Sequence, residues 1–417
     1  MARRLLLAAT GAIALVAAGL GSATAQAAAP TAAAANAKIT THRVCAATPT
    51  RGHASCFALR RTDPAAAAFN AAMRQAAARG IRPDNGSTPG SGKTPTDLQV
   101  AYNLASVASA SSSATVAIVD AYNDPTAESD LNVYRSQYGL GSCTTANGCF
   151  KKVNQSGRTT SLPATDAGWA QEISLDLDMV SAVCPKCKIL LVEAKSASLL
   201  NLGTAVNTAA KLGATAISNS YGGGDLSDSS YGSYYNHPGI AVTASSGDSG
   251  YGASFPASSS YVTAVGGTSL TLSGTTRTET AWSGAGSGCS AYNAALSVAS
   301  GFATGCSRRA EADVSAVADP KTGVNVYDTT VPTGDTSGWA VFGGTSASAP
   351  IIASVYALAH DVPTGTQANT LPYRHSSLLN DVIGGSNGTC PTTKWCNAVS
   401  GWDGPTGLGT PNGTGAF

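Results

Sequence analysis

Short apolar segments alternate with helical ones along the chain after about residue 94, and this alternation constrains the fold most strongly. Buried strands are predicted at residues 113–122, 187–194, 214–222, 239–248 and 261–267. Helices are predicted at residues 94–104, 166–183 and 198–213. Parallel strands need a crossover, usually a helix, so the pattern predicts an α/β domain around a mostly parallel central sheet.

Residues 1–27 have the three parts of a secretory signal peptide. Arg3 and Arg4 precede an apolar stretch, and the small residues of "ATAQA" place cleavage near Ala25 or Ala27. A membrane anchor is the alternative, but the apolar stretch is short and a cleavage pattern follows at once. We therefore expect a secreted, extracellular protein with no membrane attachment after cleavage.

Residues 28–94 are expected to form an N-terminal extension, and residues 95–417 the main domain. The extension contains a predicted helix at residues 63–80, which Pro64 opens and Gly80 closes. A Gly-, Pro- and Ser-rich linker follows at residues 82–97. The formal net charge of +1 over 417 residues argues against nucleic acid as a partner, because nucleic acid requires a basic surface.

Ten cysteines in an exported chain indicate disulfides. They form five sequence-local pairs: Cys45/Cys56, Cys143/Cys149, Cys184/Cys187, Cys289/Cys306 and Cys390/Cys396. Two alternatives compete with local bridges. His42, Cys45, His53 and Cys56 have a spacing that zinc can use, and "CPKC" has the spacing of a redox motif. Export favours structural bridges in both places.

Ser346 lies in "GGTSASAP", where glycines precede a serine at the start of a predicted helix. The glycines let the backbone approach a substrate, and the helix amides would face developing negative charge. A serine nucleophile needs a base to remove its proton. The alternative is an ordinary helix cap, since Thr345, Ser346 and Ser348 are all good capping residues.

Glu172 and Asp176 are spaced i and i+4 in "EISLD", hence on one face of the predicted helix. Like charges at this spacing destabilise a helix, and the surrounding residues are apolar. A close carboxyl pair in a partly buried site tends to share a proton and can act as a base. The alternative is a solvated acidic face. Asp178 is expected to face solvent or to cap a neighbouring element.

Asp248 lies in "SSGDSG" at the end of the predicted strand 239–248. Asp and Gly favour turns, so a simple turn is the alternative. However, α/β folds gather active-site groups at the carboxyl ends of their strands. A protonated Asp248 could donate a hydrogen bond to an oxyanion.

Taken together, these three motifs resemble the sedolisins, serine-carboxyl peptidases with a subtilisin-like three-layer fold. "ISNSYGG" (217–223), "FPASSSYVTAVGGTSL" (255–270) and the C-terminal "SGWDGPTGLGTPNG" extend the resemblance. It implies Ser346 as the nucleophile, Glu172 as the base and then acid, and Asp176 as its proton-sharing partner. Asp248 and the Ser346 amide would form the oxyanion hole. Carboxyl bases have reference pKa values near ~4, which favours activity at acidic pH.

The resemblance also implies further sites. One structural calcium ion would be bound by the carboxylates of Asp381 and Asp403 and the carbonyls of Val382, Val399 and Gly401. Ser220, Tyr221 and Gly222 would form the strand edge along which a peptide or protein substrate pairs. The extension 28–94 would be a short propeptide, either removed on activation or retained through Cys45–Cys56. We expect a monomer.

Two rival functions remain to be compared with the structure. An ordinary subtilase would use Ser-His-Asp, with Asp120 at the end of strand 113–122 as its aspartate. The chain lacks a suitably placed histidine, and Asp120 is expected to be structural. The other rival is a binding protein that kept the fold but lost catalysis; the intact set of four chemical residues argues against it.

Overall fold

The computed structural model describes residues 38–417 except 47–48, 81–89, 111 and 361. The predicted signal peptide 1–27 lies outside the described residues, as do residues 82–89 of the predicted linker. Among the described residues, no helix has the length and apolar content needed to cross a bilayer.

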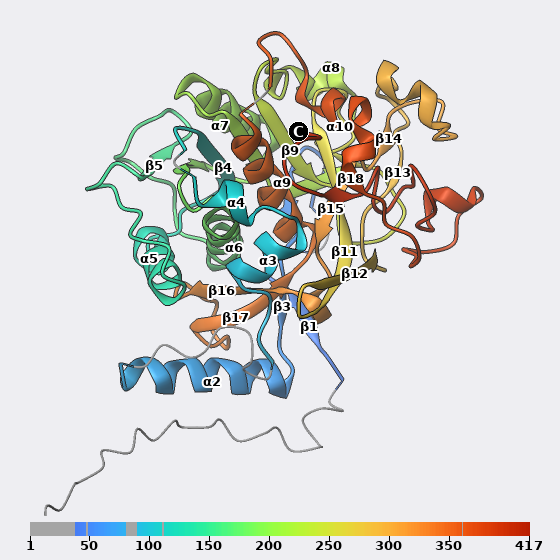
Figure 1. Ribbon diagram of the computed structural model, residues 1–417. Helices are drawn as coiled ribbons and strands as arrows, with labels where there is room; N and C mark the ends of the chain where they lie inside the picture. The colour runs from blue at the N-terminus through green and yellow to red at the C-terminus, as the bar shows by residue number, and fades with distance from the viewer. Residues whose placement is uncertain (1–37, 47–48, 81–89, 111, 361) are drawn as a thin grey trace, which may run out of the picture.

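An eight-stranded sheet forms the centre of the molecule (Figure 1). Its strands lie in the order β12-β11-β9-β7-β4-β6-β5, and β15 pairs with β11 beyond this path. Every pairing is parallel except that of β11 with β12. The predicted mostly parallel α/β fold is confirmed. The strands are β4 Thr115–Ala121, β5 Phe150–Asn154, β6 Lys188–Ala194, β7 Ala216–Asn219, β9 Ala241–Ser245, β11 Thr263–Ser273, β12 Thr276–Ala281 and β15 Val314–Val317.

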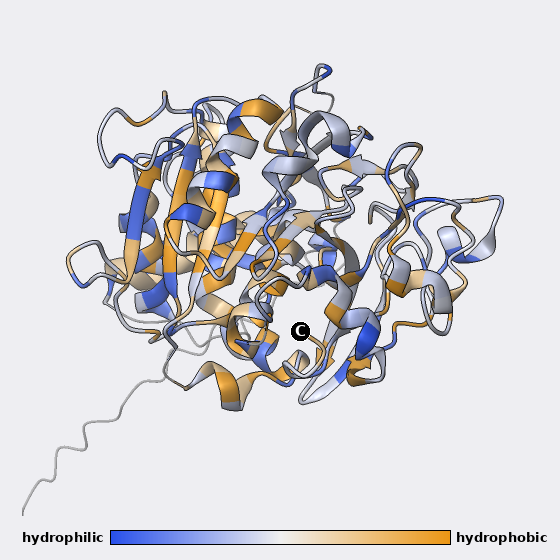
Figure 2. Ribbon diagram, turned by 90° about the horizontal axis from the view of Figure 1, so that it is seen from above, coloured by the Kyte–Doolittle hydropathy of each residue, from blue (hydrophilic) through white to orange (hydrophobic). Residues whose placement is uncertain are grey.

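Helices cover both faces of this sheet and make the three layers. On one face, α6 (Ala167–Val183) and α9 (Thr345–Ala359) pack with α3 (Pro95–Ala101) and α5 (Ala127–Gln137). On the other face, α7 (Leu199–Lys211) packs on β4 and β6. Successive residues of β4 point into the two cores, so its sequence is continuously apolar rather than alternating. Figure 2 shows hydrophobic residues along these strands and helices.

Most predicted elements form close to their expected positions. The helix predicted at 63–80 is α2 (Pro64–Ala78), which Asp63 caps by accepting from two backbone amides. Segment 94–104 divides into α3 and α4 (Ala105–Ala108), and segment 214–222 divides into β7 and β8 (Tyr221–Gly224). The predictions missed α5, β5 and β12, because their polar residues hide the apolar pattern. They also missed the buried strands β15, β16 and β17.

The N-terminal extension packs directly on the main domain. Strands β1 (Thr41–Arg43) and β3 (Leu59–Arg61) join β17 (Gly338–Gly343) and β16 (Val324–Asp328) in a four-stranded sheet. Strand β2 (Ser55–Cys56) pairs with β8, which also pairs with β10 (Ser254–Phe255). Helix α2 lies across the outer side of β16 and β17 (Figure 1). The extension thus runs from one sheet to the other across the domain.

The five predicted disulfides are confirmed, with Cα–Cα separations from 4.9 to 5.7 Å. Cys184 follows the last residue of α6, so the "CPKC" bridge ends that helix. The remaining short elements are α8 Asp228–Tyr231, α10 Leu371–Arg374, β13 Gly288–Cys289, β14 Ala310–Glu311, β18 Leu379–Asn380 and β19 Thr410–Pro411, with 3₁₀ turns η1 Gly232–Tyr234, η2 Ser297–Phe302, η3 Pro320–Thr322, η4 Ala368–Thr370, η5 Ser376–Leu378 and η6 Thr393–Trp395.

Candidate active site

Ser346 is the second residue of α9, at the end of the helix where backbone amides are free to donate. The chain enters the helix through Gly344, whose φ of +93° favours glycine. The Ser346 hydroxyl donates to the Ser220 carbonyl oxygen at 3.2 Å and accepts from the Phe57 amide at 3.1 Å. No histidine among the described residues hydrogen-bonds to Ser346, which argues against the Ser-His-Asp alternative.

Glu172 and Asp176 lie one helical turn apart on α6, and both are fully buried. Glu172 Oε2 accepts from the Ala58 amide at 2.8 Å, and Asp176 Oδ1 accepts from the Ser220 hydroxyl at 2.8 Å. Their second oxygens, Glu172 Oε1 and Asp176 Oδ2, have no hydrogen-bond partner among the described residues. A solvated acidic face is therefore excluded. The pair lies beside Ser346, because Ser220 hydrogen-bonds both to Asp176 and to Ser346.

Burial raises the pKa of Glu172 well above its usual value, and repulsion from Asp120 raises this pKa further, while the nearby Ser346 hydroxyl lowers it. Burial is also the largest cause of the raised pKa of Asp176, followed by repulsion from Asp120 and from Glu172. Buried carboxyls whose pKa values are raised in this way hold protons where isolated ones would lose them. The pair is therefore suited to accepting and returning a proton.

Asp248 follows β9 and faces the start of α9. Its Oδ1 accepts from the backbone amide and the hydroxyl of Thr345, both at 2.8 Å. Its Oδ2 has no partner among the described residues and is buried. Burial raises the pKa of Asp248 to about 7, so the carboxyl is neutral in acid and Oδ2–H can donate. The missing Cβ of Gly344 leaves room for Oδ2 and for the Phe57 carbonyl oxygen: a Cβ there would lie 2.7 Å from Oδ2 and 1.9 Å from that carbonyl oxygen.

Asp120 lies in the same group of carboxyls as Glu172 and Asp176, and this was not predicted from the sequence. It is the last residue but one of β4, and both its carboxyl oxygens are buried and without hydrogen-bond partners among the described residues. Burial and repulsion from Glu193 raise its pKa to about 8. Its position near the carboxyl end of a parallel strand was the sequence feature that could have indicated a place in the site. Asp120 was expected to be structural only, but it also raises the pKa values of Glu172 and Asp176.

Asp178 is buried and accepts from the Tyr327 backbone amide at 2.9 Å. The solvent-facing alternative for this residue was wrong, and the contact with a neighbouring element was right. Helix α6 is buried on every side, against α9, α5, α3 and β16. The same packing that buries Asp178 therefore buries Glu172 and Asp176.

Residues 220–222, predicted to bind substrate, are paired with a segment of the same chain. In β8, Gly222 pairs with Ser55 and Tyr221 with Cys56 in antiparallel register. The Phe57 amide donates to the Ser220 carbonyl at 3.4 Å, continuing the ladder. An extended peptide therefore fits this edge. Residues 55–58 were not predicted as its occupant, because no local pattern predicts pairing between segments so far apart in the chain.

The residues predicted to bind calcium lie close together in the C-terminal region. Asp381 Oδ2 accepts from the Gly401 amide at 2.9 Å, and Asp403 Oδ2 accepts from the Val399 amide at 3.2 Å. Burial raises the pKa of Asp403 to about 7, and repulsion from Asp381 contributes. The described residues contain no cluster of three or more His, Cys, Asp or Glu side chains suited to a metal. The zinc alternative at Cys45 and Cys56 is excluded by their disulfide.

The chain is similar in sequence to known peptidases over the region that contains this site. The family model described as the subtilase family matches residues 157–374. Kumamolisin from Bacillus sp. (strain MN-32) is 34% identical over 204 residues, which cover 42% of this chain and 35% of kumamolisin. Tripeptidyl-peptidase SED1 from Arthroderma otae is 47% identical over 76 residues, covering 16% of this chain and 11% of that protein. The chain therefore spans only a minor part of the length of these relatives.

A solved structure extends the likeness to the whole fold. Pseudomonas sedolisin, described as a serine-carboxyl proteinase complexed with two molecules of pseudo-iodotyrostatin, superposes with a TM-score of 0.64 and 26% identity. The match covers 77% of this chain and 96% of that one. The subtilisin-like architecture and the sedolisin resemblance are both confirmed.

Proposed function

The chain belongs to the subtilase family and, within that fold, to the sedolisins, and on this premise we propose that it is a serine-carboxyl peptidase that hydrolyses peptide bonds in proteins or peptides. One observation carries the proposal. Ser346 and Glu172 contact the amides on either side of the same carbonyl, those of Phe57 and Ala58, and no histidine takes part.

Ser346 acts as the nucleophile and forms the acyl-enzyme. Glu172 removes the Ser346 proton and then returns it to the leaving amine, and Asp176 orients Glu172 and shares its proton. The Asp248 carboxyl and the Ser346 amide stabilise the oxyanion. The unpartnered Oδ2 of Asp248 lies beside the space at Gly344 that the Phe57 carbonyl oxygen fills, and this placement supports the role.

The peptidase works best in acid. Asp248 must be protonated to donate to the oxyanion, and its pKa of about 7 means that it loses this proton as the pH rises through neutrality. The buried carboxyls around Glu172 have raised pKa values for the same reason, so the proton-sharing pair persists at a higher pH than exposed carboxyls would allow. Activity therefore declines on the alkaline side.

Calcium stabilises the C-terminal region. Asp381 and Asp403 supply two carboxylates that repel each other without a cation. The carbonyl oxygens of Val382, Val399 and Gly401 accept no hydrogen bond among the described residues, so they are free to bind a hard cation. Carboxylate and carbonyl oxygens are the ligands that calcium prefers. The ion neutralises the two carboxylates and plays no part in the chemistry.

The protein is a secreted, monomeric zymogen. Residues 1–27 direct export, and the five disulfides suit an oxidising compartment. Ser346 and Glu172 are fully buried, with the N-terminal extension in the cleft between them. The edge formed by Ser220, Tyr221 and Gly222 is already occupied, so another substrate can bind only after the extension leaves.

The test uses purified wild-type protein and the Ser346→Ala variant, incubated with a peptide library from pH 3 to 8. Products are mapped by mass spectrometry, and a serine-directed phosphonate is applied in parallel. We expect cleavage and labelling at Ser346 by the wild type only, with an acidic optimum. Folded, processed protein that neither cleaves nor reacts with the phosphonate would favour a binding protein instead. Activity with only an alkaline optimum would contradict the carboxyl mechanism.

A further inference from the structure

The segment Ser55–Arg61 crosses the candidate active site in an extended conformation. Before the crossing, β2 pairs with β8; after it, Leu59 and Arg60 of β3 pair with Gly343 and Phe342 of β17. Backbone pairing therefore holds the segment on both sides of Ser346. Phe57 and Ala58 are the two residues between the paired strands.

The peptide bond between Phe57 and Ala58 lies among the reactive groups. The Phe57 amide donates to Ser346 Oγ, and the Ala58 amide donates to Glu172 Oε2. The Phe57 carbonyl oxygen lies over Gly344, 1.9 Å from where a Cβ would be, and Asp248 Oδ2 lies 2.7 Å from the same point. The carbonyl thus faces the oxyanion donor, and the leaving nitrogen faces the acid–base carboxyl.

The Phe57 ring packs against Gly222 and Gly247 and lines one side of a pocket whose other walls are mainly glycines and small residues, among them Ser254. A Cβ on Gly222 would lie 2.9 Å from the ring carbons Cε2 and Cζ, and one on Gly247 would lie 3.7 Å from Cζ. Any larger residue at position 222 would fill the space that the ring uses. The pocket therefore selects a large, flat, apolar side chain.

We infer that the protein cleaves its own Phe57–Ala58 bond, and that it prefers substrates with an aromatic residue at the position of Phe57. This inference rests on the proposed function and adds to it the processing site and the substrate class. In the reaction, Ser346 Oγ attacks the Phe57 carbonyl carbon and Glu172 takes the hydroxyl proton. The carbon–nitrogen bond breaks as Glu172 protonates the Ala58 nitrogen, and water then hydrolyses the ester to leave a Phe57 carboxyl group and a free Ala58 amine.

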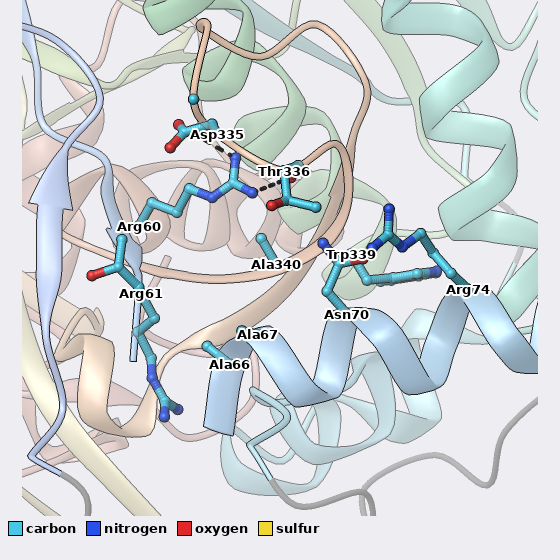
Figure 3. A pocket seen from close by; sticks show the side chains of 12 residues that line it. Arg60, Arg61, Ala66, Ala67, Asn70, Arg74, Asp335, Thr336, Trp339 and Ala340 are labelled. Atoms are coloured by element: carbon cyan, nitrogen blue, oxygen red, sulfur yellow. Dashed lines mark hydrogen bonds and ion pairs between the residues drawn. The ribbon is translucent and has the colours of Figure 1, made fainter. Parts of the chain in front are cut away.

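Arg60 positions the bond from the side beyond Ala58. Its guanidinium donates to Gln171 Oε1 at 2.8 Å, immediately before Glu172 in the sequence, and to the Thr336 carbonyl. Figure 3 shows it extending to Asp335, at 3.6 Å, and to Thr336, above helix α2. On the other side, the Cys45–Cys56 disulfide restrains the residue before Phe57. Both anchors limit how far the bond can shift from Ser346.

The experiment follows the full-length chain as purified, held at pH 3 to 8, by intact mass and N-terminal sequencing. We expect a new N-terminus at Ala58 in the wild type and an uncut chain in Ser346→Ala. Phe57→Tyr should be cut at a similar rate, whereas Phe57→Asp should be cut at least about 10-fold more slowly, because the pocket is apolar. Circular dichroism establishes that each variant is folded.

A synthetic peptide with the sequence of residues 53–62, carrying Cys56→Ser, gives a readout that does not depend on folding of the variants. The mature enzyme should cut it after the phenylalanine and should favour aromatic residues at that position in a library. An enzyme that cleaves library peptides, yet leaves its own 57–58 bond intact or shows no aromatic preference, would overturn this inference alone. A folded protein that cleaves nothing would instead contradict the proposed function.

Discussion

At the scale of single residues, the missing side chain of Gly344 allows two other groups to approach the backbone closely. Its absent Cβ leaves space for two oxygens, the Phe57 carbonyl oxygen and Asp248 Oδ2. Its φ of +93° also turns the chain so that Ser346 can begin α9. The carbonyl and the oxyanion donor proposed above can therefore lie together against bare backbone, which a side chain at position 344 would prevent.

Replacing this glycine tests the oxyanion site directly. In Gly344→Ala, the new methyl group would overlap the position of the substrate carbonyl oxygen and press on Asp248. We expect kcat on a peptide substrate to fall by about 10² to 10³, the usual loss when an oxyanion donor is displaced. Gly301→Ala is the matched control, because a Cβ at Gly301 meets nothing within 4 Å. Unchanged kcat in a folded Gly344→Ala enzyme would contradict the assignment.

At the scale of elements, α6 departs from the usual amphipathic helix. It carries Glu172, Asp176 and Asp178 into the interior, where each accepts a hydrogen bond from another element. An unpaired buried charge would cost several kcal/mol, so raised pKa values and these hydrogen bonds allow the helix to remain buried. The burial that raises the pKa values of these carboxyls also makes the proposed pair, Glu172 and Asp176, suited to proton transfer.

The calcium site proposed at Asp381 and Asp403 predicts that the stability of the C-terminal region depends on this ion. We expect calcium to raise the melting temperature of Ser346→Ala protein, which cannot digest itself. At a calcium concentration 100 times Kd, the stabilisation would be about 2.7 kcal/mol. Asp381→Ala should remove most of the shift, and magnesium should reproduce little of it, because it demands a smaller octahedral site. An equal shift in Asp381→Ala would place the ion elsewhere.

Packing between α7 and η1 gives a prediction in which two effects compete. Replacing a glycine inside a helix with alanine normally stabilises the folded protein by about 1 kcal/mol. At Gly203, however, a Cβ would lie 2.6 Å from the Tyr234 ring and 2.7 Å from its Cβ, too close for a real contact. Overpacking of this kind costs about 1–3 kcal/mol. We expect Gly203→Ala to lower the urea midpoint slightly; a rise would show that η1 can move aside.

At the scale of the whole molecule, buried carboxyls dominate the pH dependence of stability. Burial raises the pKa of Asp120 to about 8, of Asp248 and Asp328 to about 7, and of Asp124 to about 6. The pKa of Asp63, which pairs with Arg61, is lowered instead, and this offsets a small part of the proton uptake by the native state. Between pH 4 and 8 the native state therefore binds more protons than the unfolded chain does.

The sign of the effect follows from this difference. When the native state holds more protons, the free energy of unfolding falls as pH rises. The stabilisation is complete below the unfolded pKa values near ~4 and is lost as pH passes through the native values. We expect Ser346→Ala protein in constant excess calcium to melt at a higher temperature at pH 4 than at pH 8. A melting temperature that rises over this interval would contradict the raised pKa values.

Local features of this protein were predictable from its sequence because they depend on short-range rules. The strand and helix alternation, the five neighbouring cysteine pairs and the i, i+4 spacing of Glu172 and Asp176 each involve residues close in the chain. Where polar residues interrupt the local pattern, as in β5 and α5, prediction failed. The motif around Ser346 indicated a nucleophile but gave no geometry for its base.

Only the tertiary structure decided what surrounds the nucleophile. Ser346 meets Glu172 and Asp176 because α6 and α9 pack together on one face of the sheet. Asp120 joins them because β4 ends beside that helix pair, and Phe57–Ala58 enters the cleft because β2 and β3 pair with strands far along the chain. Such contacts arise from packing and backbone pairing between distant segments, so no local periodicity encodes them. The residues proposed for the chemistry could be named from the sequence, whereas the peptide bond placed against them could not.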